Sequence, residues 1–268
     1  MQTAIELTPY DKNIIVNQDT YNVSDRYQQI PTTEIISEME KYNNMKIVDF
    51  GAARVRKRDK QNKQKHFVIM QGDNSKMVDG TNMQFGIFNS SDRSSSLKIY
   101  LSIFRFVCSN GMVVSDNLME PISIRHTKNN DWKHSIASLM DEYDRLKEKT
   151  QETIHDMMNQ YMSYGDQGRL AERVAEELIN PNITGELIDP RELTIAKRIE
   201  DTPKTLWATW NKIQEHMMNG GIRRIMKKED PDEPGRLFDV VSNTHKITNE
   251  GLKIKLNRQL HDLVMNQL

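Results

Sequence analysis

The sequence has little of several features on which protein chemistry often depends. Its 268 residues include a single cysteine, Cys108, so an intramolecular disulfide is excluded. We interpret Cys108 as a small buried residue rather than a reactive thiol, in a reducing compartment. No apolar run approaches the roughly 20 residues that cross a bilayer, and the first residues lack the basic and apolar segments of a secretion signal. We therefore expect a cytoplasmic protein without membrane contact.

Motifs for common enzymatic chemistry are also missing. The chain has no phosphate-binding Gly-x-x-x-x-Gly-Lys-Ser/Thr, no Gly-x-Gly-x-x-Gly and no Gly-x-Ser-x-Gly. Its seven histidines lack a partner histidine or cysteine at the spacing of metal ligands. Four acidic residues could gather a magnesium ion but follow no known nuclease spacing: Asp189, Glu192, Glu200 and Asp201. We expect a non-enzymatic protein without catalytic residues, metal or cofactor.

Hydrophobic periodicity predicts an α+β fold with an antiparallel β-sheet core after a short N-terminal helix, followed by a mostly helical C-terminal half. We place the sheet domain at residues 1–130 and the helical region packed on it at residues 131–268. The expected strands are Met45–Val55, Lys65–Gln71, Gln84–Asn89, Leu97–Val107 and Met112–Val114. Gly51 suggests a bulge or a close backbone approach in the first strand. Asn110 and Gly111 between two apolar runs predict the two-residue turn of a hairpin.

The other segments have weaker signals. We expect residues 1–30 to be irregular or extended, a helix after Pro31 capped by Thr32 or Thr33, and a charged mobile loop at Lys227–Gly235. Apolar residues after Asp131 predict one amphipathic helix of roughly 25 to 30 residues. Three further helices are expected at Leu170–Ile179, Thr205–Asn219 and Leu252–Leu268, and glycines 165 and 168 should end the long helix. Its methionine stripe is more typical of a core than of a binding groove.

A basic stretch lies between the first two expected strands. It contains seven basic residues and one acidic residue, Asp59. The basic residues are Arg54, Arg56, Lys57, Arg58, Lys60, Lys63 and Lys65. Such a run is either a solvated hairpin tip or a phosphate-contacting patch on a β-arm, and the sequence favours neither.

Other basic and aromatic positions are weaker candidates for nucleic-acid contact. Arg105, between Phe104 and Phe106, faces away from the core if the two rings are buried, and it either contacts a nucleic acid or forms a structural salt bridge. Trp207 and Trp210 share one helix face, where core packing is favoured over base stacking. Five basic residues cluster near the end of that helix, where the helix dipole alone attracts cations: Lys212, Arg223, Arg224, Lys227 and Lys228.

Three long motifs resemble one family. They are SSDRSSSL at residues 90–97 with FRFVCSNGMVV at 104–114, TLWATWNKIQEHMMNGGI at 205–222, and ITNEGLKIKLNRQL at 247–260. They resemble the phage- and plasmid-like proteins of domain-of-unknown-function family 932, from about Tyr21 to the C-terminus. One departure is Ser91-Asp92-Arg93, where members of the family tend to carry His-Asp-Gly. The resemblance supplies no catalytic residues and implies a mobile-element protein in a bacterial host cell.

The order of helix, β-meander and long helix is also similar, in topology alone, to phage single-strand annealing proteins. Our leading hypothesis is a non-enzymatic DNA-binding protein used in single-strand annealing or recombination. It would contact single-stranded DNA through the seven basic residues and Arg105. The alternative is an anti-defence protein that binds a host restriction or immune factor. Since near-neutral monomers hold DNA weakly, we expect a homo-oligomer larger than a dimer, joined through methionine-rich helical surfaces.

Overall fold

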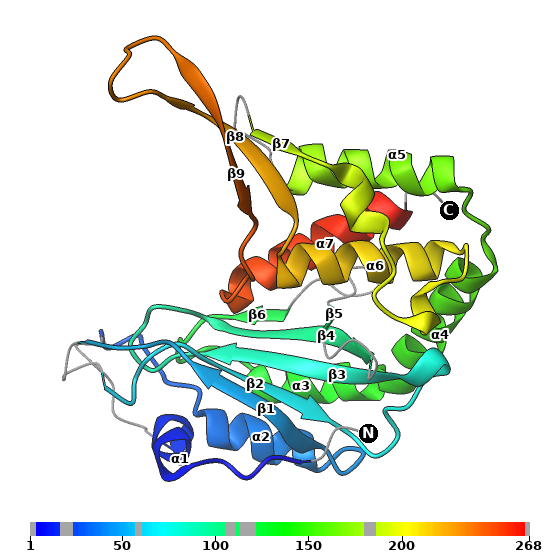
Figure 1. Cartoon of the computed structure of the whole chain (residues 1–268). Coiled ribbons are helices and arrows are strands. Elements are labelled where there is room, and N and C mark those ends of the chain that lie inside the picture. Colours follow the sequence, from blue (N-terminus) through cyan, green and yellow to red (C-terminus); the bar gives the residue numbers. More distant parts are fainter. Residues whose placement is uncertain are drawn as a thin grey trace. The chain divides into compact units, whose positions relative to one another are not determined.

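The computed structural model describes residues 4–16, 24–56, 61–105, 111–112, 122–179 and 186–265. The chain forms two compact units, Met1–Gln151 and Glu152–Leu268. The fold class is α+β, as predicted: helices precede an antiparallel sheet, and the C-terminal half is mostly helical (Figure 1). The boundary between these units lies within helix α4 (Tyr143–Asn159).

Among the described residues, the sheet of the first unit contains six antiparallel strands. Five follow the order β1-β2-β3-β4-β5, and β6 also pairs with β4. The strands are β1 (Lys46–Ala52), β2 (His66–Gln71), β3 (Thr81–Asn89), β4 (Leu97–Arg105), β5 (Gly111–Met112) and β6 (Ile122–Ile124). The five strands expected from the sequence are present, whereas β6, only three residues long, was not expected.

The turn between β4 and β5 differs from the prediction. Gly111 pairs with Phe104 and Met112 pairs with Ile103. Gly111 is therefore a strand residue, and the prediction of a two-residue Asn110-Gly111 turn is wrong, although the antiparallel pairing is confirmed. Asn110 and Cys108 lie outside the described residues. The dipeptide is a local signal, and the register of β4 against β5 overrides it.

Helices cover one face of this sheet, where the alternating residues Val68, Met70, Phe85 and Ile87 are fully buried. The helices of the first unit are α1 (Pro9–Val16), α2 (Thr32–Glu40) and α3 (Trp132–Asp141), followed by the start of α4. The ring of Tyr143 in α4 lies 5.7 Å from that of Phe85. This layer of helix on sheet is the core of the unit.

Two helix starts differ from the prediction. Residues 1–30 are not wholly irregular: α1 begins after Thr8, whose N–H and hydroxyl donate to Asp11, while the N–H of Asp11 donates back to the Thr8 hydroxyl. This reciprocal capping stabilises the start of α1, a short helix without a long apolar stripe. The expected cap of α2 by a threonine side chain is absent, because Pro31 occupies the cap position and the Thr32 hydroxyl lies 2.7 Å from Nε2 of His66 instead.

The long helix predicted after Asp131 is two helices, α3 and α4, separated at Glu142. The glycines at 165 and 168 do not end it, because α4 stops at Asn159 and both glycines lie inside α5 (Tyr164–Val174). Ser163 starts α5 by a reciprocal capping box with Asp166. A strong N-terminal cap here outweighs the weak helix propensity of two glycines.

In its described ranges, the second unit contains a helical core and a three-stranded sheet. Its helices are α5 with a π-helical turn at Ala175–Ile179, α6 (Leu206–Asn219) and α7 (Glu250–Met265). Its strands follow the order β7 (Glu186–Ile188), β8 (Arg223–Glu229), β9 (Leu237–Asn243). The prediction of a loop at Lys227–Gly235 is wrong in its first part, because Lys227–Glu229 is strand and both prolines lie in the turn that follows. Helix α6 matches its prediction, with Thr205 as its cap and Gly220 at a φ of 69°.

The other face of the first sheet carries an aromatic row, Phe67, Phe88 and Tyr100, with ring centroids 5.9 and 5.5 Å apart. Two of these rings each lie over a glycine of the neighbouring strand: Gly51 pairs with Phe67, and Gly86 pairs with Tyr100. The close approach expected at Gly51 is thus present, whereas the irregularity in β1 lies earlier, between Ile47 and Asp49. The rings cover backbone that has no side chain of its own.

We predict that a side chain at Gly86 destabilises the protein. A Cβ atom there would lie 2.1 Å from the Tyr100 ring, so Gly86→Val should displace the ring and cost about 1–3 kcal/mol of unfolding free energy. Gly168→Ala is the matched control, because its Cβ meets no atom within 4 Å and an alanine in a helix is about 1 kcal/mol better than glycine. Urea denaturation of the two variants should give shifts of opposite sign, and equal midpoints would contradict this packing.

Candidate nucleic-acid interface

The basic stretch predicted from the sequence forms the connection between β1 and β2. These strands pair antiparallel up to Ala52 and His66, and the N–H of Ala53 donates to the carbonyl of Lys65 at 2.8 Å. Arg54, Arg56 and Lys65 are exposed and Lys63 is half-buried, while Lys57, Arg58 and Lys60 lie outside the described residues. The described residues of the stretch therefore lie where the paired strands β1 and β2 end.

A second turn lies directly against this connection. The carbonyl oxygen of Lys63 accepts the N–H groups of Ser91 and Asp92, at 3.0 and 2.9 Å. These residues begin the turn between β3 and β4, which also carries Arg93. Arg93 is exposed and has a φ of 65°, in the left-handed region that favours glycine. An arginine held in this conformation costs about 1–2 kcal/mol.

Two more segments join the same end of the sheet. The amide of Gln29 donates to the Ser91 hydroxyl at 2.7 Å. Burial raises the pKa of Tyr27, and the nearby charges of Arg93 and Asp92 lower and raise it, respectively. Tyr27 in turn stacks on His126, with ring centroids 5.5 Å apart. Residues 24–30 and 125–130 thus lie beside the β3–β4 turn.

We call these four segments together the basic end. Its described basic residues are Arg26, Arg54, Arg56, Lys63, Lys65, Arg93, Arg125 and Lys128, and its described acidic residues are Asp25 and Asp92. Eight positive charges against two negative charges leave a net charge of six. The backbone pairs Lys128 N–H with the Arg26 carbonyl, which brings two of these basic residues together from positions about a hundred residues apart. Such a concentration of positive charge attracts polyanions.

Sequence reasoning identified the β1–β2 part of the basic end and missed four of its members, Arg26, Arg93, Arg125 and Lys128. Each is a single basic residue in a polar context, so no local charge run marks it. The available signal was indirect: an arginine in the Ser90–Ser96 turn at a position where the similar family tends to have glycine. Only the hydrogen bonds between distant segments bring these charges together.

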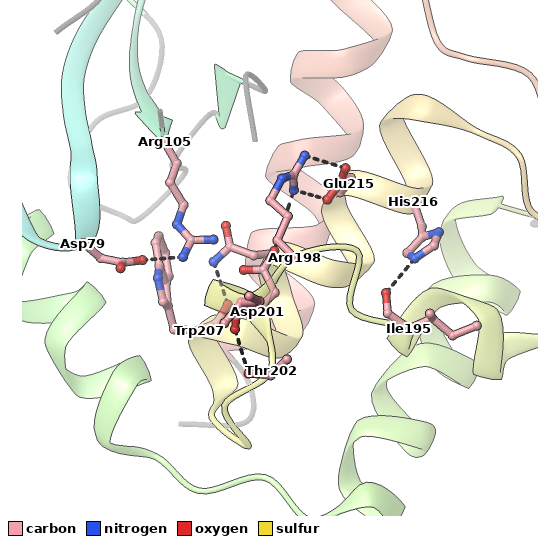
Figure 2. A network of polar contacts seen from close by, with 11 residues as sticks. Asp79, Arg105, Ile195, Arg198, Asp201, Thr202, Trp207, Glu215 and His216 are labelled. Carbon is pink, nitrogen blue, oxygen red and sulfur yellow. Dashed lines mark hydrogen bonds and ion pairs between the residues drawn. The ribbon is translucent and has the colours of Figure 1, made fainter. Parts of the chain in front are cut away.

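Arg105 is placed differently from the described residues of the basic stretch, Arg54, Arg56, Lys63 and Lys65. Its side chain is 1% exposed, and its guanidinium lies 2.7 Å from a carboxylate oxygen of Asp79 (Figure 2). Asp79 belongs to the short turn before β3, and Thr81, after that turn, pairs with Arg105. The structural salt bridge weighed from the sequence is therefore present, and Arg105 is not part of the basic end.

The tryptophans and many polar groups of α6 are buried in the second unit. Trp207 and Trp210 pack edge to face with centroids 5.4 Å apart, and both are at most 3% exposed, which confirms core packing. Arg198 pairs with both carboxylate oxygens of Glu215 in α6 (Figure 2). Burial lowers the pKa of Lys212, whose ammonium donates to Gln167 at 2.7 Å. These contacts join α6 to Arg198 and to α5, which supports a structural role for the cluster.

Two methionines of the stripe are core, as favoured from the sequence, because Met140 and Met157 are at most 6% exposed, whereas Met158 is 37% exposed. The basic residues predicted near the end of α6 separate: Lys212 is buried, and the others lie on β8. Within the described ranges, no three His, Cys, Asp or Glu side chains are grouped to hold a metal ion. In the same ranges, no helix is long and apolar enough to cross a membrane.

Comparison with known proteins places the chain in a family. The model of a domain of unknown function, DUF932, matches residues 21–237. The chain belongs to this family. It is 25% identical to the UPF0380 protein YafZ of Escherichia coli K12 over 253 residues, which cover 88% of this chain and 81% of YafZ. It is also 25% identical to the UPF0380 protein YfjQ of the same strain over 207 residues, covering 74% and 70%. No solved structure matches the chain.

We predict that the integrity of the basic end depends on pH through His126. Its Nδ1 accepts the N–H of Ile30 at 3.2 Å, which requires the neutral ring, and burial lowers its pKa below the ordinary 6.5. The unfolded chain binds this proton more readily, so the contribution of His126 to stability is present above pH 6.5 and lost as pH falls below it. Unfolding free energies from urea titrations across this range should show the decline.

His126→Phe keeps a ring against Tyr27 but removes the acceptor. At neutral pH it should cost about 1–3 kcal/mol, because the Ile30 N–H is left unpaired. Below pH 6.5 its stability should fall less steeply than that of the unaltered protein, with His66 and His216 providing the remaining slope, since burial lowers their pKa values too. Identical slopes in both proteins would show that His126 is not the group that titrates.

Proposed function

We propose that this protein binds single-stranded DNA through the basic end, without catalysing a reaction, and acts in single-strand annealing or recombination of a phage or plasmid. The observation that supports the proposal most is the convergence of eight basic residues from four separate segments on one end of one sheet. If the β1–β2 connection were only a solvated hairpin tip, there would be no reason for basic residues of the other three segments to lie beside it. Phosphate contacts supply most of the affinity in sequence-independent DNA binding.

The backbone of Arg93 adds a second argument. Its left-handed conformation costs stability, and a glycine would remove that cost. A strained residue within a charged surface suggests a function for its side chain, here a contact with phosphate. For a chain of net charge −1, binding through many weak contacts is strengthened when several copies line up on one strand. The proposal therefore includes a homo-oligomer larger than a dimer.

We predict that removing charge from either part of the basic end flattens the salt dependence of binding. One variant combines Arg54→Gln, Arg56→Gln and Lys65→Gln, and the second combines Arg26→Gln, Arg125→Gln and Lys128→Gln. Each lost phosphate contact should reduce the slope of log affinity against log salt by about 0.7 for a single strand. Both variants should lose about two units of slope, measured by fluorescence anisotropy with oligo-dT across a salt series.

The control has the same change in net charge elsewhere in the first unit. It combines Lys41→Gln, Lys46→Gln and Arg145→Gln, three exposed residues outside the four segments, each in a surface ion pair of little energetic weight. Its slope should equal that of the unaltered protein. If the control flattens the slope as much as the two variants, binding reflects net charge only. If neither the unaltered protein nor any variant binds oligo-dT, the DNA proposal fails and the anti-defence hypothesis takes its place.

We also predict opposite effects of Arg93→Gly on stability and on binding. Glycine accepts a φ of 65° without strain, so the variant should gain about 1 kcal/mol of unfolding free energy. It should bind oligo-dT more weakly, because one phosphate contact is lost. Arg93→Lys, as the comparison, keeps the charge and the strain, and should bind nearly as well without a gain in stability. Unchanged binding by Arg93→Gly would exclude Arg93 from the interface.

A further inference from the structure

Strands β8 and β9 form an arm that projects from the helices of the second unit (Figure 1). The arm spans residues 223–243, and its seven residue pairs run without a register shift. In this sheet β8 is central and β9 is the outer strand. In the part of the chain that the structure describes, no strand pairs with the outer edge of β9.

The hydrogen bonds at the two ends of the arm show which groups face outward. The N–H of Thr244 donates to the Ile222 carbonyl, and the N–H of Asp230 donates to that of Arg236. Because hydrogen-bonded pairs alternate along an antiparallel ladder, residues 238, 240 and 242 bond to β8. The N–H and C=O groups of residues 237, 239, 241 and 243 therefore point away from β8.

This outer edge lacks the features that usually protect an edge strand. Strand β9 has no proline, no lysine and no bulge, and three of its apolar residues are well exposed: Leu237 (60%), Phe238 (43%) and Val241 (54%). Its one charged residue, Asp239, pairs in register with Lys227 of the same arm. A seven-residue edge of this kind is suited to accepting another strand.

The charge of the arm identifies the partner. Near the helices β8 carries Arg223 and Arg224 and no acidic residue, whereas the outer half of the arm carries Lys227, Lys228 and Arg236 against five acidic residues, Glu229, Asp230, Asp232, Glu233 and Asp239. The arm is thus basic at one end and acidic at the other. Two identical arms aligned antiparallel bring the acidic end of each toward the basic end of the other, which is electrostatically favourable.

We propose that β9 pairs antiparallel with β9 of a second copy of this chain, about a two-fold axis at Val240. This register opposes Asp239 to Val241 of the second copy and uses all four outward-facing residues of each strand. An axis at Asp239 would instead place two carboxylates opposite each other, which is unfavourable. An axis at Val241 would leave Leu237 without a partner inside the strand.

The pairing is isologous and closes at two copies, so a larger oligomer needs a second contact elsewhere. It is a different contact from the methionine-rich surfaces expected from the sequence. None of the residues of the basic end takes part. The pairing can therefore exist whether or not the protein binds DNA, and the two proposals fail independently.

Cysteine cross-linking tests the axis. In a Cys108→Ser background, which removes the only native cysteine, Val240→Cys places two thiols at a non-hydrogen-bonded pair. The Cα atoms of such a pair lie about 4.5 Å apart, within the range of a disulfide. Mild oxidation should link most of the protein as dimer. Leu237→Cys is the control: it is well exposed but lies far from its copy in this register, and it should remain mostly unlinked.

Light scattering on charge variants gives a second test without oxidation. Val241→Glu faces Asp239 of the second copy twice by symmetry and should weaken association roughly ten-fold or more, while Val241→Lys should retain it. Circular dichroism checks that both variants fold. A protein that is monomeric at every concentration would overturn the proposal. Cross-linking of Leu237→Cys as fast as that of Val240→Cys would also overturn it. The same holds if Val241→Lys and Val241→Glu weaken association equally.

Discussion

The carbonyl oxygen of Lys63 is the point on which the basic end depends. By accepting two N–H groups from Ser91 and Asp92, it joins the β1–β2 connection to the β3–β4 turn. The turn then holds residues 24–30 through Ser91 and Gln29. All these bonds involve backbone groups or neutral side chains. These contacts hold the segments together although their basic side chains repel one another.

The sequence predicted those parts of the fold whose signals are local and repeated. Alternation located the strands of the first sheet, and Thr205 and Gly220 delimited α6. The prediction from sequence was wrong where another interaction outweighed the local signal. The Ser163–Asp166 capping box starts a helix despite Gly165 and Gly168, and the pairing of β4 with β5 excludes the turn predicted from Asn110-Gly111. The basic end has the same limit, because a run of charged residues can be recognised in a sequence, whereas isolated basic residues that come together only in the fold cannot.

The arm of the second unit contains a strand whose charged sequence does not predict a strand. The lysines, acidic residues and two prolines of residues 227–235 predict a loop. In the structure, Lys227 pairs with Asp239 of the neighbouring strand, and the prolines lie within the turn. Cross-strand pairs of opposite charge stabilise a ribbon that has little apolar surface to bury. Pairing between residues 223 and 243 is not a local property, so neither the ribbon nor its exposed edge could be derived from composition.

The distribution of charge links the two proposals. Over the full sequence, the four segments of the basic end contain eleven basic and three acidic residues, a net charge of +8, so the rest of the chain, whose total is −1, carries a net charge of −9. A polyanion is then attracted to one end of the first sheet and repelled elsewhere. The arm, with five basic and five acidic residues between 223 and 243, is neutral. Pairing of arms therefore adds no net charge at the contact, and it uses none of the residues of the basic end.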